Sequence, residues 1–242
     1  MPETKSFLFE NHPCRLIVPD APAKRRPWVW RAEFFGAFDS VDRALLERGW
    51  HIAYCSLSDR YGCPSAVADM KRFHDHLVSD FSLSKKAALF GFSRGGLYAF
   101  NYSLLYPQDV AVLYLDAPVL DICSWPGGLG SAPRAEKEWR ECLACYGLTE
   151  DTAPQSRVSP IWHLEEWVGK RIPLVLIAGE KDSTVPFSEN GARLLQWQAS
   201  SPNHGEDWLI ILKKDGDHHP HSVEKPEDVN RVAEWIVGFV VS

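Results

Sequence analysis

The chain has 242 residues, of which 45% are hydrophobic, and it carries a formal net charge of −6. An acidic chain without a basic block has no surface suited to nucleic acid or to an anionic membrane, so we expect neither as a partner. No apolar run reaches the length of a membrane span, and the first residues show no leader pattern. We therefore expect a cytoplasmic protein.

Eight short apolar runs predict β-strands, and from the third onward they alternate with helical patterns. The runs are Ser6–Glu10, Cys14–Pro19, Trp28–Glu33, Trp50–Cys55, Ala87–Phe92, Val110–Asp116, Ile172–Ala178 and Trp208–Lys213. This alternation requires crossover connections, which predicts one α/β domain over 1–242 with a mostly parallel sheet flanked by helices. Because the first two runs are almost adjacent, we expect them to form a hairpin at an antiparallel edge.

A glycine–serine–glycine motif, Gly91-Phe92-Ser93-Arg94-Gly95, follows the fifth predicted strand. Apolar residues at helical spacing (Leu97, Phe100 and Leu104) come directly after it. G-x-S-x-G between a strand and a helix is typical of a nucleophile elbow, in which a tight, strained turn presents the serine. Small residues two before and two after the serine leave room for the neighbouring chain. The motif predicts Ser93 as a nucleophile.

The segment 121–170 interrupts the alternation between the sixth and seventh predicted strands. It contains a stretch rich in glycine and proline, a charged helical pattern at Arg134–Tyr146 and several tryptophans. We interpret it as a small helical cap inserted over the active site, and we expect Trp125 to contact substrate. The alternative is a pair of connecting helices remote from the site.

A serine nucleophile needs a base, and the base needs an acid partner that orients it. Asp182 follows the seventh predicted strand, in a turn at the carboxyl edge of the sheet, and we predict it as the acid. A turn-forming aspartate that caps its own loop is the alternative. Asp116, after the sixth strand, is the rival acid.

The run Gly216-Asp217-His218-His219-Pro220-His221 follows the last predicted strand and supplies the base. The spacing from Gly216 favours His218, and we expect His219 to pack or to bind substrate. A metal reading would use Asp217 and the three histidines of this run. Because adjacent histidines in a loop rarely point at one ion, we expect no metal and no cofactor.

Developing negative charge in the transition state requires an oxyanion hole. We predict the backbone N–H of Arg94 as one donor, because it follows the nucleophile. The other should come from the loop after the third strand, where Ala32 or Arg31 is placed best. The Arg31 side chain could also pair with a substrate carboxylate, with a surface salt bridge as the alternative.

Over nearly its whole length the chain resembles a serine hydrolase of the α/β-hydrolase superfamily. Four segments are also similar to a bacterial group often linked to polysaccharide breakdown: Arg31–Phe38, Gly91–Leu97, Asp116–Val119 and Gly216–Ser222. The resemblance implies the α/β-hydrolase fold, with Ser93 as nucleophile, Asp182 as acid and His218 as base. It also implies a carbohydrate ester as substrate.

These patterns predict hydrolysis of a carboxylic ester through an acyl-enzyme. The substrate would be a small-molecule or oligosaccharide ester, and the activity a carboxylesterase, including a sugar deacetylase or methylesterase. A serine peptidase or amidase on the same scaffold is the alternative. A non-catalytic binding module is a third possibility, and the intact order of serine, acid and histidine speaks against it.

Overall fold

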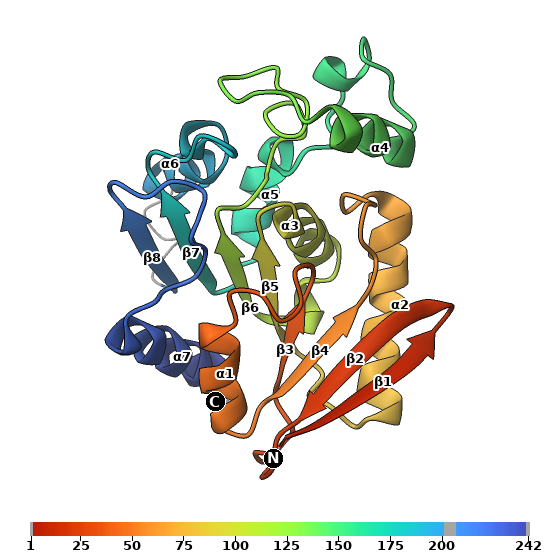
Figure 1. The fold of residues 1–242 in the computed structure, drawn as a ribbon, viewed down its shortest axis with the longest axis vertical. Coiled ribbons are helices and arrows are strands. Elements are labelled where there is room, and N and C mark those ends of the chain that lie inside the picture. The colour runs from red at the N-terminus through yellow and green to blue at the C-terminus, as the bar shows by residue number, and fades with distance from the viewer. Residues whose placement is uncertain (1, 201–206, 241–242) are drawn as a thin grey trace.

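The computed structural model describes residues 2–200 and 207–240, which form an eight-stranded sheet in the order β1-β2-β4-β3-β5-β6-β7-β8 (Figure 1). The strands are β1 (Glu3–Phe9), β2 (His12–Val18), β3 (Trp28–Arg31), β4 (His51–Cys55), β5 (Ala87–Phe92), β6 (Val110–Asp116), β7 (Leu174–Gly179) and β8 (Trp208–Lys213). β1 pairs antiparallel with β2, and β2 with β4, whereas all other neighbours are parallel. The predicted hairpin and mostly parallel sheet are confirmed.

Helices cover both faces of the sheet, as crossover connections require. They are α1 (Ser40–Glu47), α2 (Pro64–Asp80), α3 (Gly95–Leu105), α4 (Glu136–Tyr146), α5 (Leu164–Gly169), α6 (Gly191–Ser200) and α7 (Pro226–Val240). Successive residues of β5 point to opposite faces: Leu89 packs in the core under α2 and α3, and Phe90 packs in the core under α1 and α7. None of the described helices is both long enough and apolar enough to span a bilayer.

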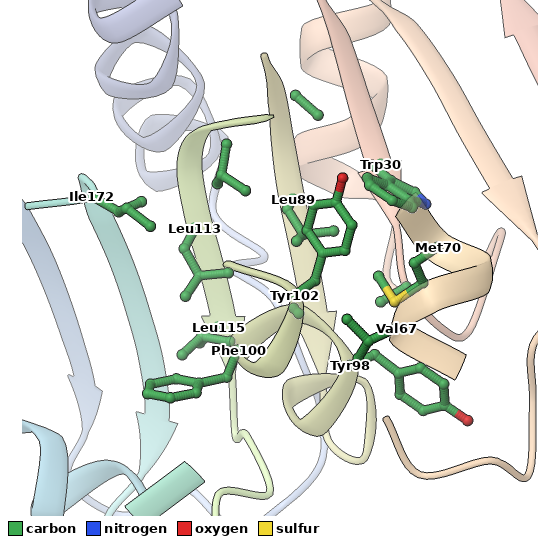
Figure 2. Close-up of a cluster of buried hydrophobic side chains, with 14 of the residues drawn as sticks. Trp30, Val67, Met70, Leu89, Tyr98, Phe100, Tyr102, Leu113, Leu115 and Ile172 are labelled. Carbon is green, nitrogen blue, oxygen red and sulfur yellow. The ribbon is translucent and has the colours of Figure 1, made fainter. Parts of the chain in front are cut away.

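The larger core lies between the sheet and α2, α3 and α5 (Figure 2). Trp30 on β3 stands edge-on to Tyr102 of α3, with ring centroids 4.8 Å apart. Burying aromatic rings of this size contributes about 1.5–3 kcal/mol each from apolar area alone. This packing fixes α3, and with it the serine that precedes α3.

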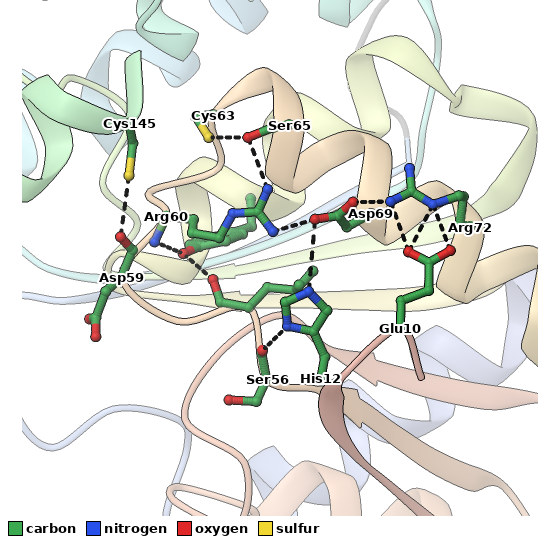
Figure 3. Close-up of polar contacts among 12 residues, drawn as sticks. Glu10, His12, Ser56, Asp59, Arg60, Cys63, Ser65, Asp69, Arg72 and Cys145 are labelled. Atoms are coloured by element: carbon green, nitrogen blue, oxygen red, sulfur yellow. Dashed lines mark hydrogen bonds and ion pairs between the residues drawn. The ribbon is translucent and has the colours of Figure 1, made fainter. Parts of the chain in front are cut away.

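The β1–β2 hairpin is fastened to α2 by charged side chains (Figure 3). Glu10 lies in the turn of the hairpin, and Arg72 of α2 donates to both of its carboxylate oxygens at 2.8–2.9 Å. Asp69 lies between Arg72 and Arg60 and pairs with both. The hairpin turn lies on the side of the carboxyl end of β4, because Cys14 of β2 pairs with Cys55 of β4. These contacts therefore hold the hairpin against α2 on that side of the sheet.

The segment between β6 and β7 divides into two parts. α4 lies beyond the carboxyl ends of the strands (Figure 1), and its Trp139 packs in a small core with Tyr61 and Leu97. α5 instead joins the main core: Trp167 packs 5.3 Å from Phe100 and donates its indole N–H to Ser103 at 2.8 Å. The part that overlies the sheet edge is therefore shorter than the predicted cap of 121–170, because α5 is held by the main core.

Candidate active site

Ser93 sits in a strained turn between β5 and α3. Its backbone φ is +47°, a value that residues other than glycine rarely adopt. A Cβ built on Gly91 would lie 2.7 Å from the carbonyl oxygen of Gly95, so glycine is required where the strand and helix meet. The Ser93 amide donates to the Asp116 carbonyl at 2.9 Å, which fixes the turn to the end of β6.

Three side chains that are far apart in the sequence form one hydrogen-bonded chain. The Nε2 atom of His218 lies 3.0 Å from Ser93 Oγ, and His218 Nδ1 lies 2.7 Å from Asp182 Oδ2. All three residues are buried. With Nδ1–H donated to a carboxylate, Nε2 carries the lone pair and accepts from the serine hydroxyl. The structure thus brings together the three residues predicted as nucleophile, base and acid.

The loop after β7 holds Asp182 in position. Its second oxygen, Oδ1, accepts the backbone N–H groups of Thr184 and Val185 at 2.9 and 2.7 Å. Asp217 then joins this loop to the histidine loop, because its Oδ1 accepts the amides of Ser183 and His218, both at 2.8 Å. These two amide bonds lower the pKa of Asp217. Asp182 therefore caps its own turn through Oδ1 and bonds to His218 through Oδ2.

Asp116, the rival acid, partners a different imidazole. Its Oδ1 accepts from His221 Nδ1 at 2.7 Å, and its Oδ2 accepts the amide of Ser222 at 2.7 Å. Asp116 and His221 are both buried. The rings of His218 and His221 lie 4.7 Å apart, so a second histidine–carboxylate pair adjoins the first. The sequence indicated His221 only as a ligand in the metal reading, and its bond to Asp116 was not predicted.

The backbone amides beside the elbow favour a different second oxyanion donor from the predicted Ala32. The Ala32 amide donates to the Phe90 carbonyl at 3.0 Å, which extends the pairing of β3 with β5 and leaves this N–H unable to bind substrate. Among the described residues, the amides of Glu33 and Arg94 have no hydrogen-bond acceptor. A Cβ built on Gly95 would lie 3.7 Å from the Glu33 nitrogen, so this amide adjoins the turn that carries Arg94. Glu33 therefore replaces Ala32 as the second candidate donor.

Arg31 is a buried structural residue and not a substrate ligand. Its guanidinium is 1% exposed, pairs with Asp42 at 3.2 Å and donates to the carbonyls of Phe34 and Ala37 at 2.8 and 2.7 Å. It also lies 3.9 Å from the centroid of the Phe92 ring. The expectation that Arg31 binds substrate is wrong, because every one of these partners is internal. Arg31 instead shapes the loop that presents the Glu33 amide.

A cavity of about 480 Å³ adjoins the elbow and is lined in part by Glu33, Arg94 and Tyr54. Arg94 donates to Glu33 at 3.2 Å and to Asp59 at 2.8 Å, and Ser58 donates to Glu33 at 3.2 Å. Burial nevertheless raises the pKa of Glu33, and the charge of Arg94 only partly opposes this effect. Arg94 of the elbow lines this cavity, but neither Ser93 nor His218 does, so the cavity lies next to the elbow and not over the serine.

His219 and Trp125 occupy different surroundings. His219 is exposed, and its ring lies 5.0 Å from that of His218 and 5.6 Å from that of Phe38. Partial burial and the neighbouring imidazoles lower the pKa of His219. Trp125 packs at the edge of the small core under α4, 6.4 Å from the Tyr61 ring. For both residues, contact with substrate stays a prediction.

No family model and no curated protein matches the sequence. Solved structures do match. A puromycin hydrolase S511A mutant complexed with PGG superposes with a TM-score of 0.67 and 18% identity, over 99% of this chain and 39% of that one. A Mycobacterium tuberculosis puromycin-hydrolyzing peptidase superposes with a TM-score of 0.70 and 16% identity, over 98% of this chain and 38% of that one. The 2,6-dihydroxy-pseudo-oxynicotine hydrolase superposes with a TM-score of 0.67 and 18% identity, over 99% of this chain and 68% of that one.

The strand order, the elbow and these superpositions together define the α/β-hydrolase fold. This chain spans less than half the length of the two puromycin-cleaving proteins, so the likeness concerns their hydrolase-fold portion. The predicted fold class is confirmed.

Proposed function

We propose that this protein is a serine hydrolase that forms an acyl-enzyme at Ser93. The observation that carries the proposal is the unbroken chain of hydrogen bonds from Asp182 through His218 to Ser93, at 2.7 and 3.0 Å. A serine hydroxyl becomes nucleophilic when a positioned imidazole accepts its proton, and the carboxylate stabilises the imidazolium that results.

The geometry accounts for each proton transfer. His218 Nε2 takes the proton of Ser93 Oγ as the oxygen attacks the substrate carbonyl carbon. The amides of Arg94 and Glu33 receive the oxyanion of the tetrahedral intermediate, a contribution typically of 10²–10³ in rate for each donor. The C–N or C–O bond then breaks as His218 returns the proton to the leaving group. Water repeats the cycle and releases the acid from Ser93.

The structural neighbours support an amide as the acyl donor. Two of them are described as a puromycin hydrolase and a puromycin-hydrolyzing peptidase, and another as an acylaminoacyl peptidase. We therefore favour the peptidase or amidase alternative, with a small peptide or an arylamide as substrate. No finding supports the carbohydrate ester that the resemblance implies.

Two measurements test the proposal. A fluorophosphonate probe should label the wild type at Ser93, and Ser93→Ala should remain unlabelled. Ser183→Ala is the matched control and should still be labelled, since Ser183 is a neighbouring exposed hydroxyl that contacts Asp217. Probe capture at another residue, or none in the wild type, would reject the assignment of the nucleophile.

Substrate class is tested with p-nitroanilides and p-nitrophenyl esters that share one acyl group, beside acetylated sugars. An amidase cleaves both members of each pair, because the ester has the better leaving group. Turnover of acetylated sugars with no cleavage of any anilide would reverse our preference for amides.

A further inference from the structure

Three imidazoles converge at the mouth of the site. One ring nitrogen from each of His218, His219 and His221 lies within 4.8 Å of the other two. The ring centroids are 4.7–5.0 Å apart, and the rings stand nearly perpendicular to one another. The expectation that adjacent histidines would diverge is not met, because the loop turns back so that all three rings share one small volume.

Two of the three rings are already oriented as metal ligands are. His218 Nδ1 is bonded to buried Asp182 and His221 Nδ1 to buried Asp116, both at 2.7 Å. A carboxylate on Nδ1 fixes the tautomer with the lone pair on Nε2, the arrangement found behind histidine ligands of zinc. Metal-binding proteins use this pairing, and here it occurs twice within one cluster.

We propose that His218, His219 and His221 form a site for a divalent ion of the zinc type, and that the bound ion inhibits the enzyme reversibly. Zinc binds imidazole at about 2.0–2.1 Å, which sets nitrogen–nitrogen separations of about 3.4 Å in a tetrahedron. The ring nitrogens must close by up to about 1.4 Å from their present separations, and His219 is the exposed ring of the three. Ser93 Oγ lies 3.0 Å from His218 Nε2, within reach of an ion bound to that nitrogen.

The donor set selects the ion. Imidazole nitrogens suit zinc and its transition-metal neighbours, whereas calcium and magnesium require oxygen. Asp217 is not part of this cluster, and its Oδ1 accepts the backbone amides of Ser183 and His218. The inhibitory consequence rests on the proposed function, because the ion takes the Nε2 lone pair that removes the Ser93 proton.

The site is tested on the full chain with Zn²⁺ and Co²⁺ by calorimetry and absorption spectroscopy. One Zn²⁺ should bind per wild-type chain, and His219→Ala should weaken binding at least tenfold. His76→Ala, which removes a histidine of α2 that pairs with Asp80, is the matched control and should bind as the wild type does. Because all six cysteines are free, the Co²⁺ complex must show ligand-field bands without a thiolate charge-transfer band.

Labelling by the fluorophosphonate probe links the ion to the base. Zn²⁺ should slow labelling of the wild type at least tenfold and a chelator should restore it, each rate being compared with the same variant's metal-free rate. Equal affinity in wild type and His219→Ala, a thiolate band, or unchanged labelling of zinc-loaded protein would each overturn the proposal. If Ser93 is never labelled, the proposed function fails, while calorimetry still decides the metal site.

Discussion

The carboxylate of Asp116 accepts the Nδ1–H of His221 at 2.7 Å, and this bond joins the end of β6 to the loop that carries His218. The main-chain carbonyl of Asp116 accepts the amide of Ser93 at 2.9 Å. One residue therefore positions both the nucleophile, through its backbone, and the loop of the base, through its side chain. Its role is in alignment, because it contacts neither reacting atom.

Asp116→Asn should lower activity by disturbing this alignment. The amide cannot accept from both His221 and Ser222, so one buried donor is left unpaired at a cost of about 1–3 kcal/mol in unfolding free energy. A shift of the base by about 1 Å would reduce kcat by on the order of 10². Denaturant unfolding and kcat are measured together. Asp109→Asn, which removes the negative charge that pairs with Lys71 but keeps an oxygen for Tyr102, is the control and should lose stability with kcat unchanged.

Asp182→Asn should have a much larger effect on kcat. The asparagine oxygen can still accept from Thr184 and Val185, so its NH₂ group faces His218 Nδ1 and enforces the wrong tautomer, which costs about 10⁴ in kcat. Asp217→Asn changes the neighbouring acid in the same way but keeps an acceptor for the two loop amides. The kcat of Asp217→Asn should stay within about tenfold of the wild-type value, since this change affects only the position of the loop. A larger loss for Asp217→Asn than for Asp182→Asn would mean that the acid is misassigned.

The sheet and the three residues of the hydrogen-bonded chain could be predicted because their signals are local. An apolar run followed by G-x-S-x-G specifies both a strand and the turn after it, which places Ser93. Asp182 and His218 likewise follow apolar runs, and parallel strands bring their carboxyl ends to one edge. For these residues, order along the chain was enough.

The surroundings of the site could not be predicted, because they depend on where strand pairing stops and on which distant groups meet. The backbone amide of Ala32 still bonds to β5, whereas that of the next residue, Glu33, does not. Nothing in the sequence marks the residue at which this pairing stops. The burial of Arg31 is explained by Asp42 and two loop carbonyls, none of which the sequence marks as its partner. His221 meets Asp116 across 105 positions, a pairing that no local pattern encodes.

Arg31→Lys should separate support of the oxyanion loop from substrate binding. A lysine cannot donate to Phe34, Ala37 and Asp42 together, so buried acceptors lose their partners and the unfolding free energy falls by about 1–3 kcal/mol. Because the loop also presents the Glu33 amide, kcat should fall by on the order of tenfold or more with KM for a small neutral substrate unchanged.

The control for Arg31 is an exposed arginine of α1. Arg43, with a side chain 65% exposed, pairs with Asp39 at 3.3 Å, and Arg43→Lys should change stability by less than about 0.5 kcal/mol. A rise in KM with constant kcat in Arg31→Lys would instead restore the substrate contact that the sequence predicted for this residue.

Glu33→Gln should reveal the cost of an ionised carboxylate under the oxyanion loop. Glu33 is 2% exposed, and its Oε1 has no hydrogen-bond partner among the described residues. Burial raises its pKa despite Arg94, so the folded state holds this proton more strongly than the unfolded chain, where the pKa is about 4.3. The stability that the proton contributes is complete below the unfolded pKa and is lost as pH rises through the folded pKa.

The wild type should therefore lose unfolding free energy relative to Glu33→Gln as pH rises above the unfolded pKa of about 4.3, since the glutamine cannot ionise. Urea unfolding of both proteins at intervals of pH gives the difference, which should grow and then level off above the folded pKa. Glu150→Gln, at an exposed pair with Arg134, should show only a small change over this range. A difference that moves in favour of the wild type as pH rises would mean that attraction to Arg94 outweighs burial, and that Glu33 is held as a stable ion beside the nucleophile.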